Sequence, residues 1–130
     1  MQTYLLIALG GALGSVLRFF LGGVIASRFG DAFPWGTLTI NVTGSFLIGL
    51  FFTLTAANGR WQAGGDLRLF LMTGICGGYT TFSAFSLQTL VLAREGDWRR
   101  AGGYIVSSVA LCLAGVWLGH LLASRLNSVA

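Results

Sequence analysis

The sequence predicts an all-α integral membrane protein with a single domain, residues 1–130, whose four helices cross the bilayer. The first observation is composition: 55% of the residues are hydrophobic and 9% are charged, whereas soluble domains carry about 25% charged residues. The second is a mean hydropathy of +0.77. The third is a series of apolar stretches that approach or exceed the roughly 20 residues needed to cross the hydrocarbon core. We expect transmembrane helices at about residues 3–27, 36–57, 67–93 and 99–125.

The first helix carries a charge inside its apolar stretch. Arg18 lies within 3–27, and a charged side chain near the bilayer centre costs roughly 2.5–3.5 kcal/mol. Either it extends to the interface, or it is a fixed positive charge that favours an anion in a nearby vestibule. No Lys or Arg precedes the apolar run, and Arg18 interrupts it, so we expect a membrane helix and not a signal peptide.

The second helix carries a polar stripe. Thr37, Asn41 and Ser45 are spaced by four residues and therefore share one face. Asn41 lies in otherwise apolar sequence, and its amide has two N–H donors. Such a side chain either joins neighbouring helices by hydrogen bonds or donates to a passing anion.

The third helix contains the least regular segment, residues 77–86 (GGYTTFSAFS). Paired glycines followed by two threonines are unfavourable inside a helix, so we expect a break here. The alternative is a continuous helix whose hydroxyls bond to carbonyls one turn earlier. Non-helical backbone at membrane depth is tolerated where it is buried or lines a cavity, and broken helices bind ions through freed carbonyls. Phe82 and Phe85 share a face beyond the break, and either their positive ring edges attract an anion or they pack as ordinary apolar residues.

The fourth helix has a second candidate lining face. Tyr104, Ser108 and Cys112 recur every four residues, which places them on one side of the helix. His120, the only histidine, lies near the helix end, where we expect an interfacial position with no role in proton relay. Cys76 and Cys112 lie in apolar runs and are expected to be small buried hydrophobic residues.

The charged residues exclude several classes of function. All four acidic residues lie in loops, so no carboxylate is available inside the membrane for a proton-coupled carrier. The net charge of +4 comes from arginines at the ends of apolar runs, which indicates lipid headgroups as partners and not nucleic acid. No combination of nucleophile and base, and no cluster of metal-ligating side chains, points to an enzyme.

Loop charges and glycine spacing favour an antiparallel pair of chains. If the N-terminus is cytoplasmic, three loop arginines lie on that side and four on the other, which gives no clear orientation under the positive-inside rule. A chain that inserts in both orientations and pairs as a dual-topology homodimer fits this balance. Three small-xxx-small pairs favour close helix packing, within or between subunits. They are Gly10 and Gly14, Gly74 and Gly78, and Gly115 and Gly119.

Three stretches together resemble the fluoride-channel family known as Fluc or CrcB. They are Gly10–Arg18 (GGALGSVLR), Gly36–Gly49 (GTLTINVTGSFLIG) and Thr73–Ser86 (TGICGGYTTFSAFS). The third stretch is the most specific, and the first is weak by itself. The likeness covers nearly the whole chain, with the same four spans.

The resemblance implies an antiparallel homodimer with two pores and a structural sodium ion at its centre. The backbone carbonyls of Gly77 and Thr80 from each subunit would bind the sodium. The pore residues that it implies are Asn41 as amide donor and Phe82 and Phe85 as ring-edge contacts. Further polar lining would come from Thr37, Ser83, Tyr104 and Ser108, and Arg18 matches the arginine of the family's first helix.

Two positions depart from the family's pattern. Cys112 replaces a serine that some members have one turn after Ser108. A thiol is a weaker donor than a hydroxyl, so conductance would differ if this position touches the ion. Ala84 stands where relatives often have a threonine.

The function implied by the resemblance is a passive fluoride-selective channel in the inner membrane, which exports fluoride and reduces its toxicity. Amide, hydroxyl and ring-edge groups replace the ion's hydration without holding it too tightly, and the negative cell interior drives the anion out. Two alternatives stay open from the sequence: a coupled transporter for small cations, which the missing membrane carboxylate disfavours, and a non-conducting membrane scaffold.

Overall fold

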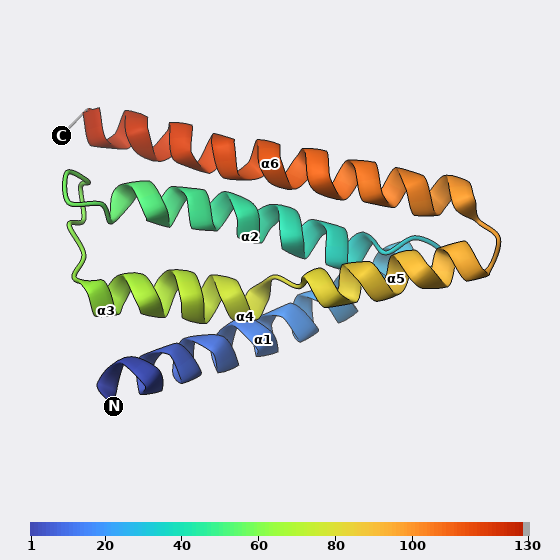
Figure 1. Cartoon of the computed structure of the whole chain (residues 1–130), viewed down its shortest axis with the longest axis horizontal. Helices are drawn as coiled ribbons and strands as arrows, with labels where there is room; N and C mark the ends of the chain where they lie inside the picture. Colours follow the sequence, from blue (N-terminus) through green and yellow to red (C-terminus); the bar gives the residue numbers. More distant parts are fainter. Residues whose placement is uncertain (129–130) are drawn as a thin grey trace.

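The computed structural model describes residues 1–128, which form a bundle of four helical passes (Figure 1). Three passes are single helices: α1 (Gln2–Phe29), α2 (Trp35–Leu54) and α6 (Trp98–Ser128). The third pass consists of four pieces: α3 (Gly65–Arg68), η1 (Leu69–Cys76), α4 (Gly77–Tyr79) and α5 (Phe82–Arg94). Successive passes run in opposite directions, so the start of α1 and the end of α6 lie at the same end of the bundle.

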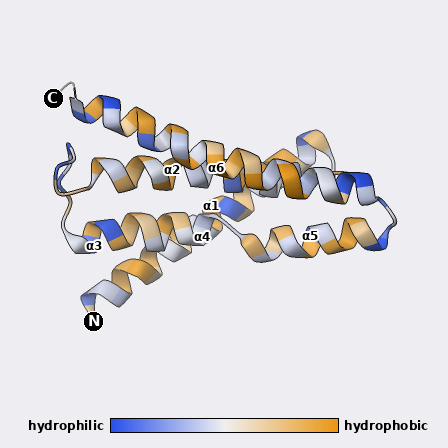
Figure 2. Ribbon diagram, turned by 45° about the horizontal axis from the view of Figure 1, so that its top comes forward, coloured by the Kyte–Doolittle hydropathy of each residue, from blue (hydrophilic) through white to orange (hydrophobic). Residues whose placement is uncertain are grey.

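The surface of the bundle is apolar along most of its length. Hydrophilic residues gather mainly at the two ends (Figure 2), and large apolar side chains such as Phe19 and Leu113 are exposed on the helices. Within residues 1–128, the helices α1, α2 and α6 are each long and apolar enough to cross a membrane unbroken. The prediction of an all-helical chain with four passes is confirmed.

The third pass breaks where the sequence predicts it. Thr80 (φ −81°, ψ 159°) and Thr81 (φ −153°, ψ 113°) are extended and separate α4 from α5. The Thr81 hydroxyl accepts the Ala84 N–H at 3.2 Å and so caps the start of α5. The π-helical winding of η1, just before the break, was not predicted; such wider turns occur frequently at functional sites.

The second helix ends at Leu54, before the predicted residue 57. Thr55 is buried, and its carbonyl accepts a hydrogen bond from Arg68 Nη1 at 2.9 Å. The Arg68 guanidinium also lies 5.5 Å from the centre of the Phe52 ring. Arg68 therefore satisfies a carbonyl at the C-terminal end of α2 and fixes where the third pass begins.

Glycines bring the passes into close contact within the chain. A Cβ added to Gly14 of α1 would lie 2.3 Å from the Ile75 carbonyl oxygen, and one added to Gly78 would lie 2.4 Å from the Gly11 carbonyl oxygen. Gly115 and Gly119 of α6 pack in the same way against the backbone of α2. The predicted close packing is confirmed, and for these three pairs it lies within one chain.

Replacing Gly119 by alanine is expected to destabilise the fold by about 1–3 kcal/mol. A Cβ there would lie 2.1 Å from the Phe46 carbonyl oxygen, so α6 and α2 must move apart. Gly102→Ala on the same helix is the matched control, because nothing lies within 4 Å of its added Cβ. Thermal unfolding in detergent, followed by circular dichroism, measures both variants. Equal unfolding midpoints would contradict this account of the interface.

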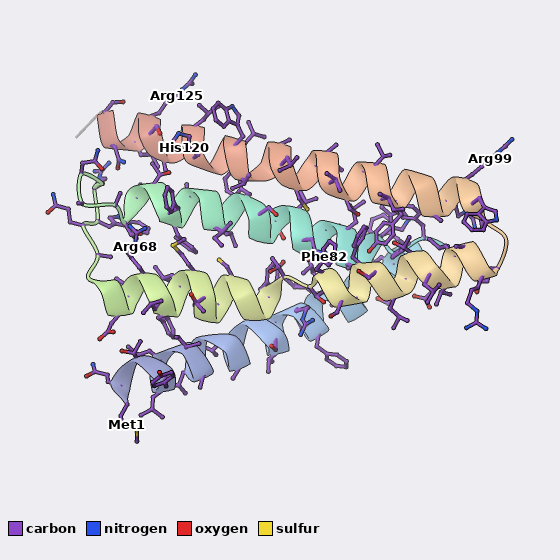
Figure 3. All side chains as sticks on the ribbon, viewed as in Figure 1. Met1, Arg68, Phe82, Arg99, His120 and Arg125 are labelled. Atoms are coloured by element: carbon purple, nitrogen blue, oxygen red, sulfur yellow. The ribbon has the colours of Figure 1, made fainter. Side chains whose placement is uncertain are left out.

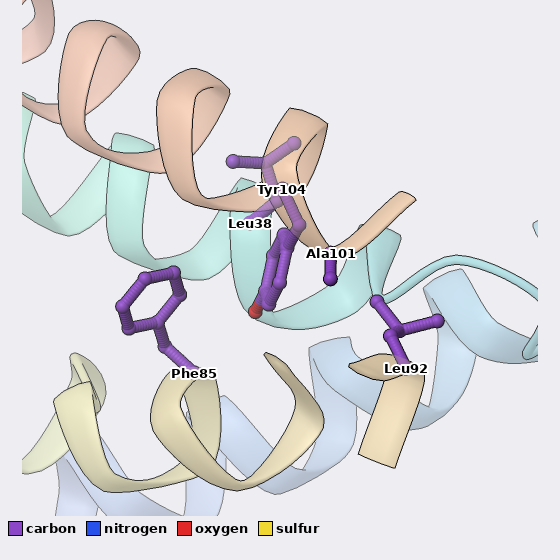
Figure 4. Close-up of a cluster of buried hydrophobic side chains, with 5 residues drawn as sticks. All are labelled: Leu38, Phe85, Leu92, Ala101 and Tyr104. Carbon is purple, nitrogen blue, oxygen red and sulfur yellow. The ribbon is translucent and has the colours of Figure 1, made fainter. Parts of the chain in front are cut away.

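The buried apolar core lies where α5 packs against α2 and α6 (Figure 4). Its members are Leu38, Phe85, Leu92, Ala101 and Tyr104. The core begins immediately after the break, so it fixes the position of α5 even though the third pass is interrupted.

Candidate functional site

A groove of about 420 Å³ lies beside the break in the third pass. Residues of α2, η1, α4, α5 and α6 line it, together with both threonines of the break. Phe82, one of these residues, lies in the middle part of the bundle, away from Arg99 at one end and Arg125 at the other (Figure 3). Ser45 and Cys112 of the two predicted lining faces belong to the groove, and so do six of the site residues that the resemblance implies. They are Asn41, Gly77, Thr80, Phe82, Phe85 and Ser108.

Asn41 joins α2 to the break through both ends of its side-chain amide. Its Nδ2 donates to the Thr81 carbonyl at 2.9 Å, and its Oδ1 accepts the Thr81 N–H at 2.7 Å. The interhelical role that the sequence allowed is therefore present. Because an amide nitrogen has two N–H donors, one N–H of Asn41 is not used by Thr81, and Asn41 itself lines the groove.

The break frees two particular carbonyls. In an unbroken α-helix, the Thr81 and Ala84 amides would donate to the carbonyls of Gly77 and Thr80, four residues earlier. Here the Thr81 N–H donates to Asn41, and the Ala84 N–H donates to the Thr81 hydroxyl. The carbonyls of Gly77 and Thr80 thus lose their helical donors, and both residues line the groove. Gly44 makes room for this backbone, because a Cβ there would lie 2.3 Å from the Thr80 methyl group.

Two phenylalanine rings line the groove after the break. Phe82 is 76% exposed and Phe85 is 8% exposed, with their ring centres 5.2 Å apart and the planes tilted by 48°. Phe85 also packs against Tyr104, at 5.1 Å between ring centres (Figure 4). Phe85 is thus fixed by the core, whereas Phe82 stands at the surface of a single chain.

Ser108 carries a buried hydroxyl on the groove wall that has no partner among the described residues. It is 7% exposed, and its Oγ forms no hydrogen bond with any of the described residues. An unpaired buried hydroxyl costs about 1–3 kcal/mol. An unpaired buried hydroxyl in a native structure calls for an explanation, and here the residue that carries it lines the groove.

A second hollow, of about 850 Å³, shares Thr81 with the groove. Two residues that the sequence predicted for the site, Arg18 and Thr37, line this hollow. Gln88 lines it as well. Arg18 is partly buried, and no carboxylate of residues 1–128 lies within ion-pairing distance of it. Arg18 is therefore not held in an ion pair beside this hollow, which Arg100 also lines. Asp31 and Glu95 line the hollow at its loop end.

The remaining predicted lining residues lie outside the groove. Tyr104 is fully buried, and its hydroxyl donates to Gln88 Oε1 at 2.9 Å. Ser83 is exposed, with its Oγ 3.3 Å from the Thr81 hydroxyl. His120 pairs with the Thr53 hydroxyl at 2.8 Å, in the C-terminal part of α6, and does not line the groove. Sequence reasoning missed Gln88, whose signal is an amide three residues after Phe85 on the same face of α5.

The donors available to a metal ion are backbone oxygens. Among residues 1–128, no three His, Cys, Asp or Glu side chains are placed to hold a metal. Carbonyl oxygens suit hard cations, and unwound backbone in membrane helices coordinates sodium. The freed carbonyls of Gly77 and Thr80 therefore have the chemistry that a sodium ion requires.

Comparison with known proteins gives consistent matches over the whole chain. The family described as CrcB-like protein, Camphor Resistance (CrcB), matches residues 5–120. A protein of Opitutus terrae is 62% identical over 129 residues, which cover 99% of this chain and 98% of that protein. A protein of Rhodospirillum rubrum is 58% identical over 126 residues, covering 97% and 98%. Another, from Paramagnetospirillum magneticum, is 58% identical over 127 residues, covering 98% and 99%. Each of the three is named fluoride-specific ion channel FluC.

Proposed function

The chain belongs to the CrcB family, and from this membership we propose that it is a fluoride-selective ion channel. It is a multi-pass protein of the cell inner membrane and not an enzyme. The observation that carries the proposal is the groove, where an amide, a hydroxyl and two aromatic rings meet beside the break.

Fluoride is small and strongly hydrated, so its path must offer donors that replace water. The free N–H of Asn41 and the unpaired Ser108 hydroxyl are such donors, and the edges of Phe82 and Phe85 add weak positive potential. None of these groups carries a charge, so they compensate fluoride for its lost hydration without binding it too tightly to leave. Arg18 beside the second hollow raises the local concentration of anions.

The lining of the groove disfavours a proton-coupled mechanism. No acidic side chain lines it, and the acidic residues of the second hollow lie at its loop end. Flux would therefore be passive. The negative potential of the cell interior drives an anion outward, so the physiological direction would be export of fluoride, which reduces its toxicity.

The conducting unit would be an antiparallel homodimer. The loop arginines show no bias that fixes one orientation, and Phe82 and Gly77 are exposed in a single chain. One chain offers two freed carbonyls for a cation, and a second copy would supply the others. A sodium ion held there would be bound by four carbonyl oxygens at the centre of the dimer.

Replacement of sodium by caesium is expected to lower the thermal stability of the dimer. An unchanged stability would refute the proposed sodium site and would leave the proposed channel function unaffected.

Fluoride efflux from liposomes tests the proposed function. Purified protein is reconstituted into liposomes loaded with potassium fluoride, valinomycin is added to allow potassium exit, and external fluoride is followed with an ion-selective electrode. We expect rapid fluoride release and no chloride release in a parallel experiment. Release at the rate of empty liposomes, or equal chloride flux, would refute the proposal.

A further inference from the structure

Two thiols line the groove; the sequence predicted both as small buried residues and also placed Cys112 on a candidate lining face. Cys76 belongs to η1 and Cys112 belongs to α6, and both are free cysteines. All other residues that line the groove are uncharged and carry amide, hydroxyl, backbone or hydrocarbon groups. The thiols are therefore the only soft ligands in a site whose other groups are hard donors or apolar.

The two thiols differ in access. Cys76 is 2% exposed, whereas Cys112 is only partly buried. Thiol reactions require contact between sulfur and reagent, so they select partly exposed cysteines over enclosed ones. Cys112 is therefore the thiol that a small solute in the groove reaches first.

A second observation marks the same wall of the groove as a ligand position. Ser108 lies four residues before Cys112, one turn away on the same face of α6. Its hydroxyl is more than nine-tenths buried, lines the groove and has no partner among residues 1–128. The groove, of about 420 Å³, thus offers space for a ligand beside the partly exposed Cys112 thiol and the residue that carries an unpaired hydroxyl.

We propose that the Cys112 thiol is a binding site for soft, thiophilic metal cations, and that a metal bound there closes the groove to fluoride. Closure rests on the proposed function, whereas metal binding does not. With mercury(II) chloride as the probe, the thiol proton leaves to water, a sulfur–mercury bond forms and one chloride ligand leaves the metal. No electrons are transferred, so no oxidant or reductant is needed. The resulting sulfur–mercury–chloride group has no net charge, and it adds bulk one turn from the Ser108 hydroxyl.

The test compares wild type with Cys112→Ser and Cys76→Ala in the liposome assay, before and after mercury(II) chloride. We expect fluoride efflux of wild type and Cys76→Ala to fall to the level of empty liposomes and to return with excess 2-mercaptoethanol. Cys112→Ser, which keeps a small polar side chain, is expected to be insensitive. Inhibition of Cys112→Ser by mercury, or a lack of inhibition of Cys76→Ala, would overturn the assignment of the metal site to Cys112.

Intact-mass measurement separates this proposal from the channel function. Detergent-solubilised wild type is expected to retain one mercury atom per chain, and Cys112→Ser is expected to retain none under the same brief exposure. Equal retention by both proteins overturns the site, whether or not fluoride moves. Fluoride release by untreated wild type decides the channel function separately. Size-exclusion profiles before and after mercury show whether lost flux reflects dissociation, which would count against closure of the groove.

Discussion

Asn41→Asp is expected to reduce fluoride efflux to the level of empty liposomes. The substitution keeps the shape of the side chain. In wild type the Thr81 N–H lies 2.7 Å from Asn41 Oδ1, and one carboxylate oxygen of the aspartate would still accept this N–H. The other oxygen replaces the nitrogen that donates to the Thr81 carbonyl at 2.9 Å, so two acceptors face each other. The free N–H of the groove is lost, and a carboxylate there repels an anion.

A matched control exists near the end of α6, outside the groove. The Asn127 amide also bridges two backbone groups: it accepts the Arg60 N–H at 2.9 Å and donates to the Thr53 carbonyl at 3.3 Å. Asn127→Asp therefore makes the same chemical change in the same kind of bridge, outside the groove. We expect this variant to conduct like wild type.

Fluoride-electrode traces of the two variants, at equal reconstituted protein, decide the question. Size-exclusion chromatography shows whether each remains folded. If folded Asn41→Asp conducts at the wild-type rate, Asn41 serves α2–break packing alone, and the anion path lies elsewhere. Equal loss in both variants points instead to a general effect of breaking a backbone bridge.

The number of passes and the break follow from composition and local sequence. Apolar stretches of sufficient length define the passes, because the bilayer sets one length scale. The break follows from residues 77–86, where paired glycines and threonines weaken the helix. The glycine spacing predicted that Gly14 packs closely against another helix. It did not predict that this helix belongs to the same chain, because tertiary packing decides which helices meet.

The sequence predicted which residues line the site better than it predicted what each side chain does there. Spacing by four placed Asn41 and Ser108 on candidate lining faces, and both line the groove. Spacing did not reveal that Thr81 occupies most of the Asn41 amide, because that pairing is set by the distance between two helices. It also did not separate Tyr104, paired with Gln88, from Ser108 on the next turn. Hydrogen-bond partners of polar side chains in a membrane bundle are chosen by three-dimensional neighbours, not by sequence periodicity.

Ser108→Ala is expected to slow fluoride efflux roughly tenfold or more, because a hydrogen bond to a charged group contributes about 1.5–3 kcal/mol. The same substitution is expected to leave thermal stability unchanged or raise it. The Ser108 hydroxyl has no protein partner among the described residues. Its removal therefore breaks no hydrogen bond and removes the free-energy cost of burying an unpaired polar group. The two effects have opposite signs, which a purely structural role of Ser108 does not produce.

The adjacent residue supplies the control for this last prediction. Ser107 is partly buried on the same helix, but its hydroxyl donates to the Tyr104 carbonyl at 3.3 Å, and it does not line the groove. Ser107→Ala is therefore expected to conduct like wild type. Efflux rates from the fluoride electrode and unfolding midpoints from circular dichroism are measured for both variants. Normal efflux by Ser108→Ala would remove its hydroxyl from the fluoride path, and a clear loss of stability would show that the hydroxyl has a structural partner in the assembled dimer.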